Sequence, residues 1–120
     1  MSIQLEMEEM PDYLAARFRG SGVAEEIWRQ FELIAEHCKC ASYNKLLIDT
    51  TGAELKISLA ERFLAREKAA VFAHYSLKVA VVTRPERIHP QRFGEQVAWS
   101  RGVYIKAFTD LRAAEEWLLK

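Results

Sequence analysis

A short apolar segment followed by a polar turn constrains the fold of this chain more than any other stretch. Leu46, Leu47 and Ile48 are consecutive apolar residues, and Asp49, two threonines and Gly52 follow them. An apolar run that ends at a turn signal is typical of a strand buried on both faces, although so short a run also fits a buried helix. A helical pattern opens shortly after Gly52. The stretch therefore predicts a strand, a loop and a helix N-terminus, an arrangement in which α/β proteins often place their sites.

Length and charge limit the classes of protein that fit this chain. Its 120 residues are half apolar, which is enough for the core of a single domain over residues 1–120. Seventeen basic residues balance seventeen acidic ones, so net charge gives no reason to expect a nucleic acid or an anionic membrane as partner. No apolar run is long enough to span a membrane, and the first residues lack the pattern of a signal peptide, so we expect a cytoplasmic protein.

The N-terminal segment predicts a hairpin and a helix. Ile3, Leu5 and Met7 alternate with polar residues, and the second strand, 13–19, follows a turn at Pro11 and Asp12. In that strand, Leu14, Ala16 and Phe18 share one face, and Arg17 and Arg19 lie on the other. We expect the glycines of the segment 20–22 to end this second strand. Apolar residues at helical spacing then predict a helix over about residues 22–40.

The rest of the chain alternates helices and strands. A Ser-x-x-Glu capping box at Ser58 and Glu61 opens a second helix that ends near residue 75. The other expected elements are a strand over 77–83, a third helix from Pro90 to about Gly102, a strand over 103–108, and a final helix that is capped at Thr109 and Asp110 and turns Leu111, Ala114 and Leu118 inward. Strands separated by helical crossovers are parallel neighbours. The order β-β-α-β-α-β-α-β-α predicts an α/β fold, a mixed five-stranded sheet covered by helices.

This order and several local motifs resemble the SpoIIAA-like proteins, a branch of the STAS or anti-sigma factor antagonist fold. The motifs that carry the resemblance are Leu46-Leu47-Ile48-Asp49, the serine-initiated helix, Val79-Ala80-Val81-Val82, the closing Phe108-Thr109-Asp110, and Ala113-Ala114-Glu115-Glu116-Trp117-Leu118. The resemblance covers nearly the whole chain. It implies a non-enzymatic regulatory module that binds a protein partner, such as a kinase or an anti-sigma-like protein.

The resemblance also implies a phosphorylated serine at the start of the second helix. Counted from Asp49, the similar position is Ser58, with Thr50 and Thr51 as further candidate phosphoacceptors. The acid before that serine and the glycine after it are missing here, since Ile57 and Leu59 flank it. Phosphate at a helix N-terminus would meet free N–H groups and the positive end of the helix dipole. Ser58 also fits the simpler role of a helix cap.

Two kinds of partner fit this reading. A protein would bind the Thr50-to-Arg62 region through the partner-binding surface of Asp49, Gly52, Glu54 and Arg62, and an exposed sheet edge would allow a homodimer. The alternative is a small hydrophobic ligand, because SpoIIAA-like proteins resemble small relatives of SEC14-like lipid-transfer folds. The candidate cleft comprises Phe63, Phe72, Tyr75, Phe93 and Trp99, which equally fit an ordinary core.

Other clusters point to weaker hypotheses. Arg84, Arg87, His89 and Arg92 would contact an anion or an acidic partner, or form a solvated face. Asp49, Thr83 and Lys106 match the order of a receiver domain's key residues, but the opening hairpin does not fit that fold, and Glu8, Glu9 and Asp12 lie at its turn, not after a first strand.

No catalytic or metal site is evident. His37, His74 and His89 lie in different segments, and no phosphate-binding loop is present. Cys38 and Cys40 are predicted to pack, one inward and one outward, and a zinc or redox role is the alternative. We expect no enzyme, no cofactor and no metal.

Overall fold

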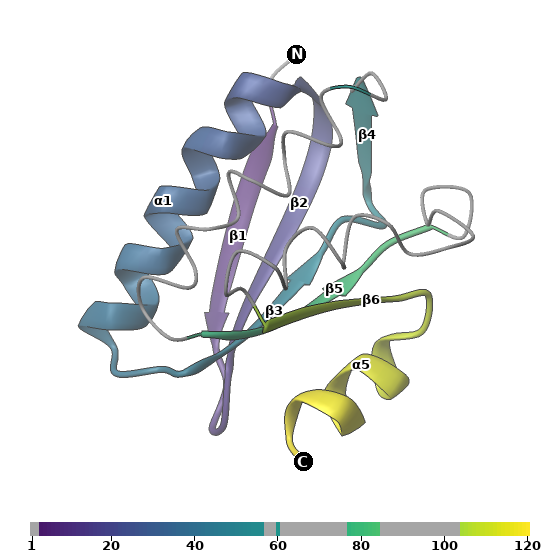
Figure 1. Cartoon of the computed structure of the whole chain (residues 1–120). Helices are drawn as coiled ribbons and strands as arrows, with labels where there is room; N and C mark the ends of the chain where they lie inside the picture. The colour runs from purple at the N-terminus through teal and green to yellow at the C-terminus, as the bar shows by residue number, and fades with distance from the viewer. Residues whose placement is uncertain (1–2, 57–59, 61–76, 85–103) are drawn as a thin grey trace.

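A computed structural model describes residues 3–56, 60, 77–84 and 104–120 (Figure 1). Its elements are β1 (Gln4–Glu9), β2 (Leu14–Val23), α1 (Ala24–Cys40), β3 (Lys45–Asp49), β4 (Ala53–Lys56), β5 (Lys78–Val82), β6 (Tyr104–Phe108) and α5 (Leu111–Leu118). Ala60 is helical, and the rest of the second predicted helix and all of the third lie outside the described residues.

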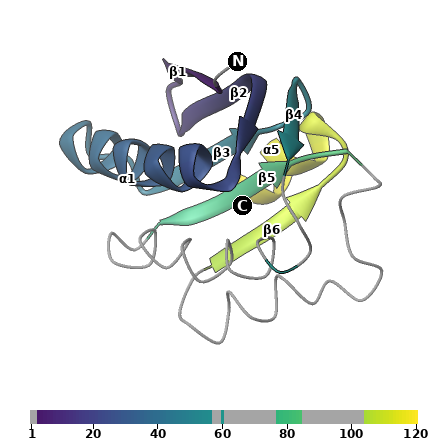
Figure 2. The same ribbon diagram turned by 90° about the horizontal axis from the view of Figure 1, so that it is seen from above.

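The strands form one mixed sheet in which β3 is central. The order is β1-β2-β3-β5-β6, with β1 and β2 antiparallel and the later neighbours parallel (Figure 2). The predicted hairpin and the central position of residues 45–49 are confirmed. β4 pairs with β2 and makes the sheet six-stranded, so the prediction of five strands is wrong.

β2 is longer than predicted, and on the side away from β1 it pairs with two strands, one along each half of its length. Its first half pairs with β3, from Leu14 opposite Leu46, and its second half pairs with β4, from Gly20 opposite Ala53. The prediction that glycines end this strand is therefore wrong, and α1 begins at Ala24 instead of residue 22. Gly20 adopts a positive φ of 88°, which glycine tolerates at no steric cost. A Cβ at Gly22 would overlap the side chain of Ile3.

The two faces of the sheet are buried by different helices. On one face, α1 packs on alternate residues of the strands, and the largest buried side chains there are Phe18, Leu14, Leu46, Ile34 and Val79. On the other face, α5 covers a second cluster of buried residues, comprising Tyr13, Ala15, Leu47, Ala80, Val82, Ala114 and Leu118. Because side chains alternate along a strand, Leu46 and Leu47 enter opposite clusters.

The two helices confirm some local predictions. Asp110 caps α5 by accepting a hydrogen bond from the backbone N–H of Ala113 at 3.2 Å. Leu111 was expected to be buried but is 44% exposed, because the first turn of α5 extends beyond the apolar surface that Ala114 and Leu118 cover. In α1, Cys38 is buried and Cys40 is exposed, as predicted. Among the described helices, none has the length and apolar character needed to cross a membrane.

Candidate functional site

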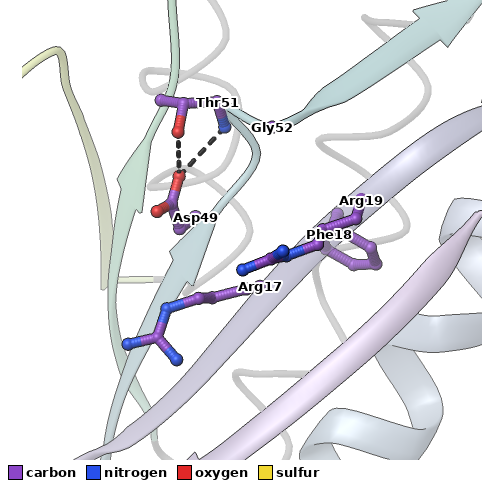
Figure 3. Close-up of a pocket in the computed structure, with 6 residues that line it drawn as sticks. All are labelled: Arg17, Phe18, Arg19, Asp49, Thr51 and Gly52. Atoms are coloured by element: carbon purple, nitrogen blue, oxygen red, sulfur yellow. Dashed lines mark hydrogen bonds between the residues drawn. The ribbon is translucent and has the colours of Figure 1, made fainter.

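The loop after β3 is held in a defined conformation by its own side chains. The Asp49 carboxylate accepts hydrogen bonds from the Thr51 backbone N–H at 2.9 Å and from the Thr51 hydroxyl at 2.7 Å (Figure 3). The Ala53 N–H then donates to the Thr50 carbonyl at 3.2 Å, which closes a turn. Aspartate commonly stabilises turns through such a bond to the backbone two residues on. The loop at the carboxyl end of β3 is therefore ordered locally by Asp49.

The two threonines of this loop lie in different surroundings. Thr50 is 8% exposed, and its hydroxyl donates to the Val82 carbonyl at 3.2 Å. Thr50 also extends the sheet, because its N–H donates to the same carbonyl at 2.9 Å. Thr51 is exposed, and its hydroxyl contacts Asp49 alone among the interactions described for it. Of these two candidate phosphoacceptors, only Thr51 is accessible without local opening of the loop.

Arg84 ties the loop to the end of β5. Its Nε and Nη2 donate to the Thr51 carbonyl at 3.1 and 3.0 Å, and its Nη1 donates to Glu54 Oε1 at 3.1 Å. Arg84 was predicted as an anion contact, and the anion that it meets here is the carboxylate of Glu54. The sequence contained a signal for this contact, because the carboxyl ends of parallel neighbouring strands meet at one edge of the sheet.

A shallow hollow of about 210 Å³ lies beside this loop, lined by Arg17, Phe18, Arg19, Asp49, Thr51 and Gly52 (Figure 3). Arg17 lies opposite Asp49 in the β2–β3 register. Both arginines form ion pairs with β1, Arg17 with Glu8 at 3.5 Å and Arg19 with Glu6 at 3.6 Å. The sequence identified these arginines only as the polar side of a strand, since nothing local linked them to a loop thirty residues away.

The hollow continues a row of charged residues on the α5 face of the sheet. Across the strands, Glu6 lies opposite Arg17, Arg17 opposite Asp49, and Asp49 opposite Val82. In this row, Val82 of β5 is apolar and buried beneath α5, whereas Asp49, Arg17 and Glu6 are charged. The change occurs at β3, because α5 does not cover the positions of Glu6 and Arg17 on β1 and β2. We call Glu6, Glu8, Arg17, Arg19 and Asp49 the charged strip. It adjoins the loop, so both belong to one candidate binding surface.

Several predicted residues lie outside the described part of the chain. These are the phosphoacceptor Ser58, the surface residue Arg62, the anion contacts Arg87, His89 and Arg92, the histidine His74, and the cleft residues Phe63, Phe72, Tyr75, Phe93 and Trp99. Of the predicted partner-binding surface, the structure describes Asp49 and Gly52, which line the hollow, and Glu54, which bonds to Arg84.

The remaining hypotheses concern metals and a receiver site. His37 pairs with Glu9 at 3.1 Å, and the described residues contain no group of three or more metal-ligating side chains. Asp49 binds Thr51, Thr83 is buried, and the Lys106 Nζ lies 5.5 Å from the centre of the Phe108 ring. The three residues of the receiver hypothesis therefore have separate local contacts.

Comparisons with known proteins agree with this architecture. No family model matches the sequence, and no curated relative was found. A crystal structure of an uncharacterised DUF3478-family protein with a SpoIIAA-like fold, from Shewanella loihica PV-4, is 25% identical, with a TM-score of 0.58 over 97% of this chain and 93% of its own.

Two anti-sigma factor antagonists also share the fold. One from Mycobacterium paratuberculosis has a TM-score of 0.63 at 14% identity, covering 99% of this chain and 96% of its own. Unphosphorylated SpoIIAA has a TM-score of 0.52 at 9% identity, covering 97% of both chains. The chain is thus an α/β protein with a mixed sheet. Its fold is SpoIIAA-like, the fold that the sequence motifs indicated.

Proposed function

We propose that this protein is a regulatory module that binds another protein through the loop after β3, without catalysing a reaction. The observation that carries the proposal is the ordered, exposed loop. Asp49 fixes its conformation from within, Arg84 fixes it from β5, and Thr51, Gly52 and Glu54 remain exposed. Such a loop loses little conformational entropy on binding. The fold shared with two anti-sigma factor antagonists supports the same class of function.

Phosphorylation of Thr51 would switch this surface by a local electrostatic change. The Thr51 hydroxyl lies 2.7 Å from the Asp49 carboxylate, to which it donates a hydrogen bond. A phosphate on that oxygen cannot donate this bond, and its charge would repel the carboxylate. The turn would then open. Ser58 remains a second candidate phosphoacceptor in the same Thr50-to-Arg62 region, by its position in the sequence.

Affinity capture from extracts of the native cell tests the proposal. Wild-type protein, Thr51→Glu and Glu54→Lys serve as bait, and mass spectrometry identifies the captured proteins. The two loop variants should lose a partner that the wild-type protein retains, because one disrupts the turn and the other reverses a charge that Arg84 holds. The same spectra report any phosphate on Thr51 or Ser58.

Ser42→Glu is the matched control. Ser42 is an exposed hydroxyl residue that precedes β3, at the opposite end of the strand from the loop. This variant should capture the partner as the wild-type protein does. Equal capture by all four baits, or a partner lost only with Ser42→Glu, would contradict binding through the loop.

A further inference from the structure

The outer edge of β1 is open in the described part of the chain. β1 pairs with β2 on one side, and among the described residues no other backbone group binds its main chain (Figure 2). Side chains contact the backbone of the residues that flank the strand: the Ile3 N–H donates to Glu26 at 3.2 Å, and the Tyr43 hydroxyl donates to the Met10 carbonyl at 2.6 Å, while the Met10 N–H closes the hairpin turn with the Tyr13 carbonyl. A row of free N–H and C=O groups can pair with one more strand.

The side chains of β1 alternate between two chemistries. Leu5 and Met7 lie opposite Phe18 and Ala16, so they belong to the apolar α1 face. Glu8 lies opposite Ala15 and Glu6 opposite Arg17, so both belong to the α5 face. Glu9 is the exception, because it lies opposite Leu14 on the α1 face, where it pairs with His37 at 3.1 Å. A strand added along residues 5–8 would thus meet Leu5 and Met7 on one face and the carboxylates of Glu6 and Glu8 on the other.

The two carboxylates retain capacity to bind another cation. The side chains of Glu6 and Glu8 are 54% and 52% exposed. Their ion pairs with Arg19 and Arg17 span 3.6 and 3.5 Å, longer than a charge-assisted hydrogen bond. Exposed pairs of this kind are weak, so a second basic side chain can share the same carboxylates.

We propose that the β1 edge binds an extended segment of a partner protein in which lysine or arginine alternates with an apolar residue. The basic residues of that segment would lie beside Glu6 and Glu8, and the apolar ones beside Leu5 and Met7. Main-chain hydrogen bonds provide affinity in such strand addition, and the alternate side chains provide specificity. The β1 edge adjoins the loop after β3 through the charged strip, but it binds through main-chain groups of β1 that the proposed function does not use, so the inference goes beyond that function.

Charge complementarity favours this partner over a second copy of the chain. Two β1 strands can pair antiparallel with like faces together in two registers that include most of the strand. One register places Glu6 opposite Glu6, and the other places Glu6 opposite Glu8. Like charges directly opposite each other destabilise a sheet. The same carboxylates that attract a basic strand therefore disfavour a homodimer through this edge.

Synthetic peptides test the inference directly on the wild-type protein. One capped peptide of six residues, the length of β1, alternates lysine and valine, and a second has the same composition in two blocks. Backbone amide signals in NMR are followed during each titration. The alternating peptide should shift the signals of Gln4–Glu9 and leave those of Thr51 and Gly52 in place. Equal binding of both peptides, or no shift in β1, would overturn the inference.

Variants separate this edge from general electrostatic attraction. Glu6→Gln with Glu8→Gln should weaken binding of the alternating peptide about fivefold, because each cross-strand charge pair contributes modestly. Glu32→Gln with Glu116→Gln makes the same charge change at exposed sites on α1 and α5 and should leave the affinity unchanged. If the Glu6/Glu8 variant and the Glu32/Glu116 variant bind the peptide with equal affinity, the proposal is wrong. A wild-type dimer whose contacts map to β1 would equally overturn the proposal.

Discussion

The two faces of the sheet are built from the same strands but differ in chemistry. On the face that α1 packs against, alternate strand residues are apolar from β2 across to β6. Under α5, the buried strand residues come from β2, β3 and β5, and Phe108 of β6 is partly buried. Towards β1, the same face carries the charged strip. Leu46 and Leu47 are neighbours in β3, yet they belong to opposite faces.

This difference suggests that one face stabilises the fold and that the other contributes a binding surface. Burial of apolar side chains is the main favourable term in folding, whereas exposed ion pairs contribute little. The α1 face should therefore provide most of the free energy of folding. The charged strip is available for a partner because the sheet does not depend on it. Four predictions test this division, in order of decreasing effect.

The largest effect is expected from cavities on the two faces. Leu46→Ala should lower the free energy of unfolding by about 4 kcal/mol and Leu47→Ala by about 3 kcal/mol, because Leu46 packs among larger side chains. Chemical denaturation of both variants measures the two values. Each substitution is the control for the other, since both remove the same atoms from one strand. A larger loss for Leu47→Ala would reverse the comparison of the faces.

The second prediction uses the pH dependence of stability. Cys38 lies on the buried face of α1, and this burial raises the pKa of its thiol from 9.0 to about 11. A raised pKa in the folded state means that stability is complete below pH 9 and is lost as pH rises through about 11, because the unfolded thiol ionises first. The loss attributable to Cys38 should reach about 2 kcal/mol at pH 11.

Variants isolate the contribution of this thiol. Burial also raises the pKa of Tyr13 and of Tyr43, so the wild-type curve contains more than one group. Denaturation of Cys38→Ala across this pH range should give a shallower decline than that of the wild-type protein. Cys40→Ala, which changes the exposed thiol, should decline as the wild-type protein does. Identical curves for the two variants would show that the α1 face admits water at Cys38.

The third prediction compares a glycine on each side of the division. Gly22→Ala should cost about 1 to 2 kcal/mol, because its Cβ would overlap Ile3, which belongs to the α1-face core. Gly52 lines the charged hollow, and a Cβ there would meet the Phe18 carbonyl at 3.6 Å, an ordinary contact. Gly52→Ala should therefore keep the wild-type midpoint in thermal or chemical unfolding.

A compensating substitution checks the cause of the Gly22→Ala effect. Ile3→Ala in the background removes the two Ile3 atoms that come closest and leaves only its Cβ, at 3.2 Å, so adding Gly22→Ala should cost less than it does in the wild-type protein. If its cost is the same in both backgrounds, the backbone of β2 and not the contact with Ile3 requires glycine. In that case, packing on the α1 face would not be the reason for glycine at position 22.

Much of the fold was predictable because its signals are local. The alternation in β1, the apolar run of β3 and the cap at Asp110 each specify an element within a few residues. β4 was missed because a strand of four residues has little pattern of its own, and its partner is the distant second half of β2. The glycines at 20 and 22 were misread for the same reason, since Ile3 determines what fits at Gly22.

The candidate site also contains residues that local sequence predicts and contacts that depend on distant strand pairing. Asp49, Gly52 and Glu54 were predicted from their place after the central strand; Asp49 and Gly52 line the hollow, and Glu54 bonds to Arg84. Arg84 and Glu54 are thirty positions apart, and only the parallel pairing of β3 with β5 brings their side chains into contact. Arg17 and Arg19 were predicted only to lie on the polar face of the second strand. Their proximity to the loop depends on register, which a local pattern does not contain.

The smallest effect is expected within the charged strip itself. Glu8→Gln, Arg17→Gln and the double variant should each change the free energy of unfolding by less than about 0.5 kcal/mol, since the pair is exposed and its atoms lie 3.5 Å apart. A double-mutant cycle from chemical denaturation gives the coupling energy of the pair. The division between the faces requires this energy to be small and to fall further as salt is added. A coupling above about 1 kcal/mol would assign the strip a structural role, and β1 would then depend on its carboxylates to stay in the sheet instead of presenting them to a partner.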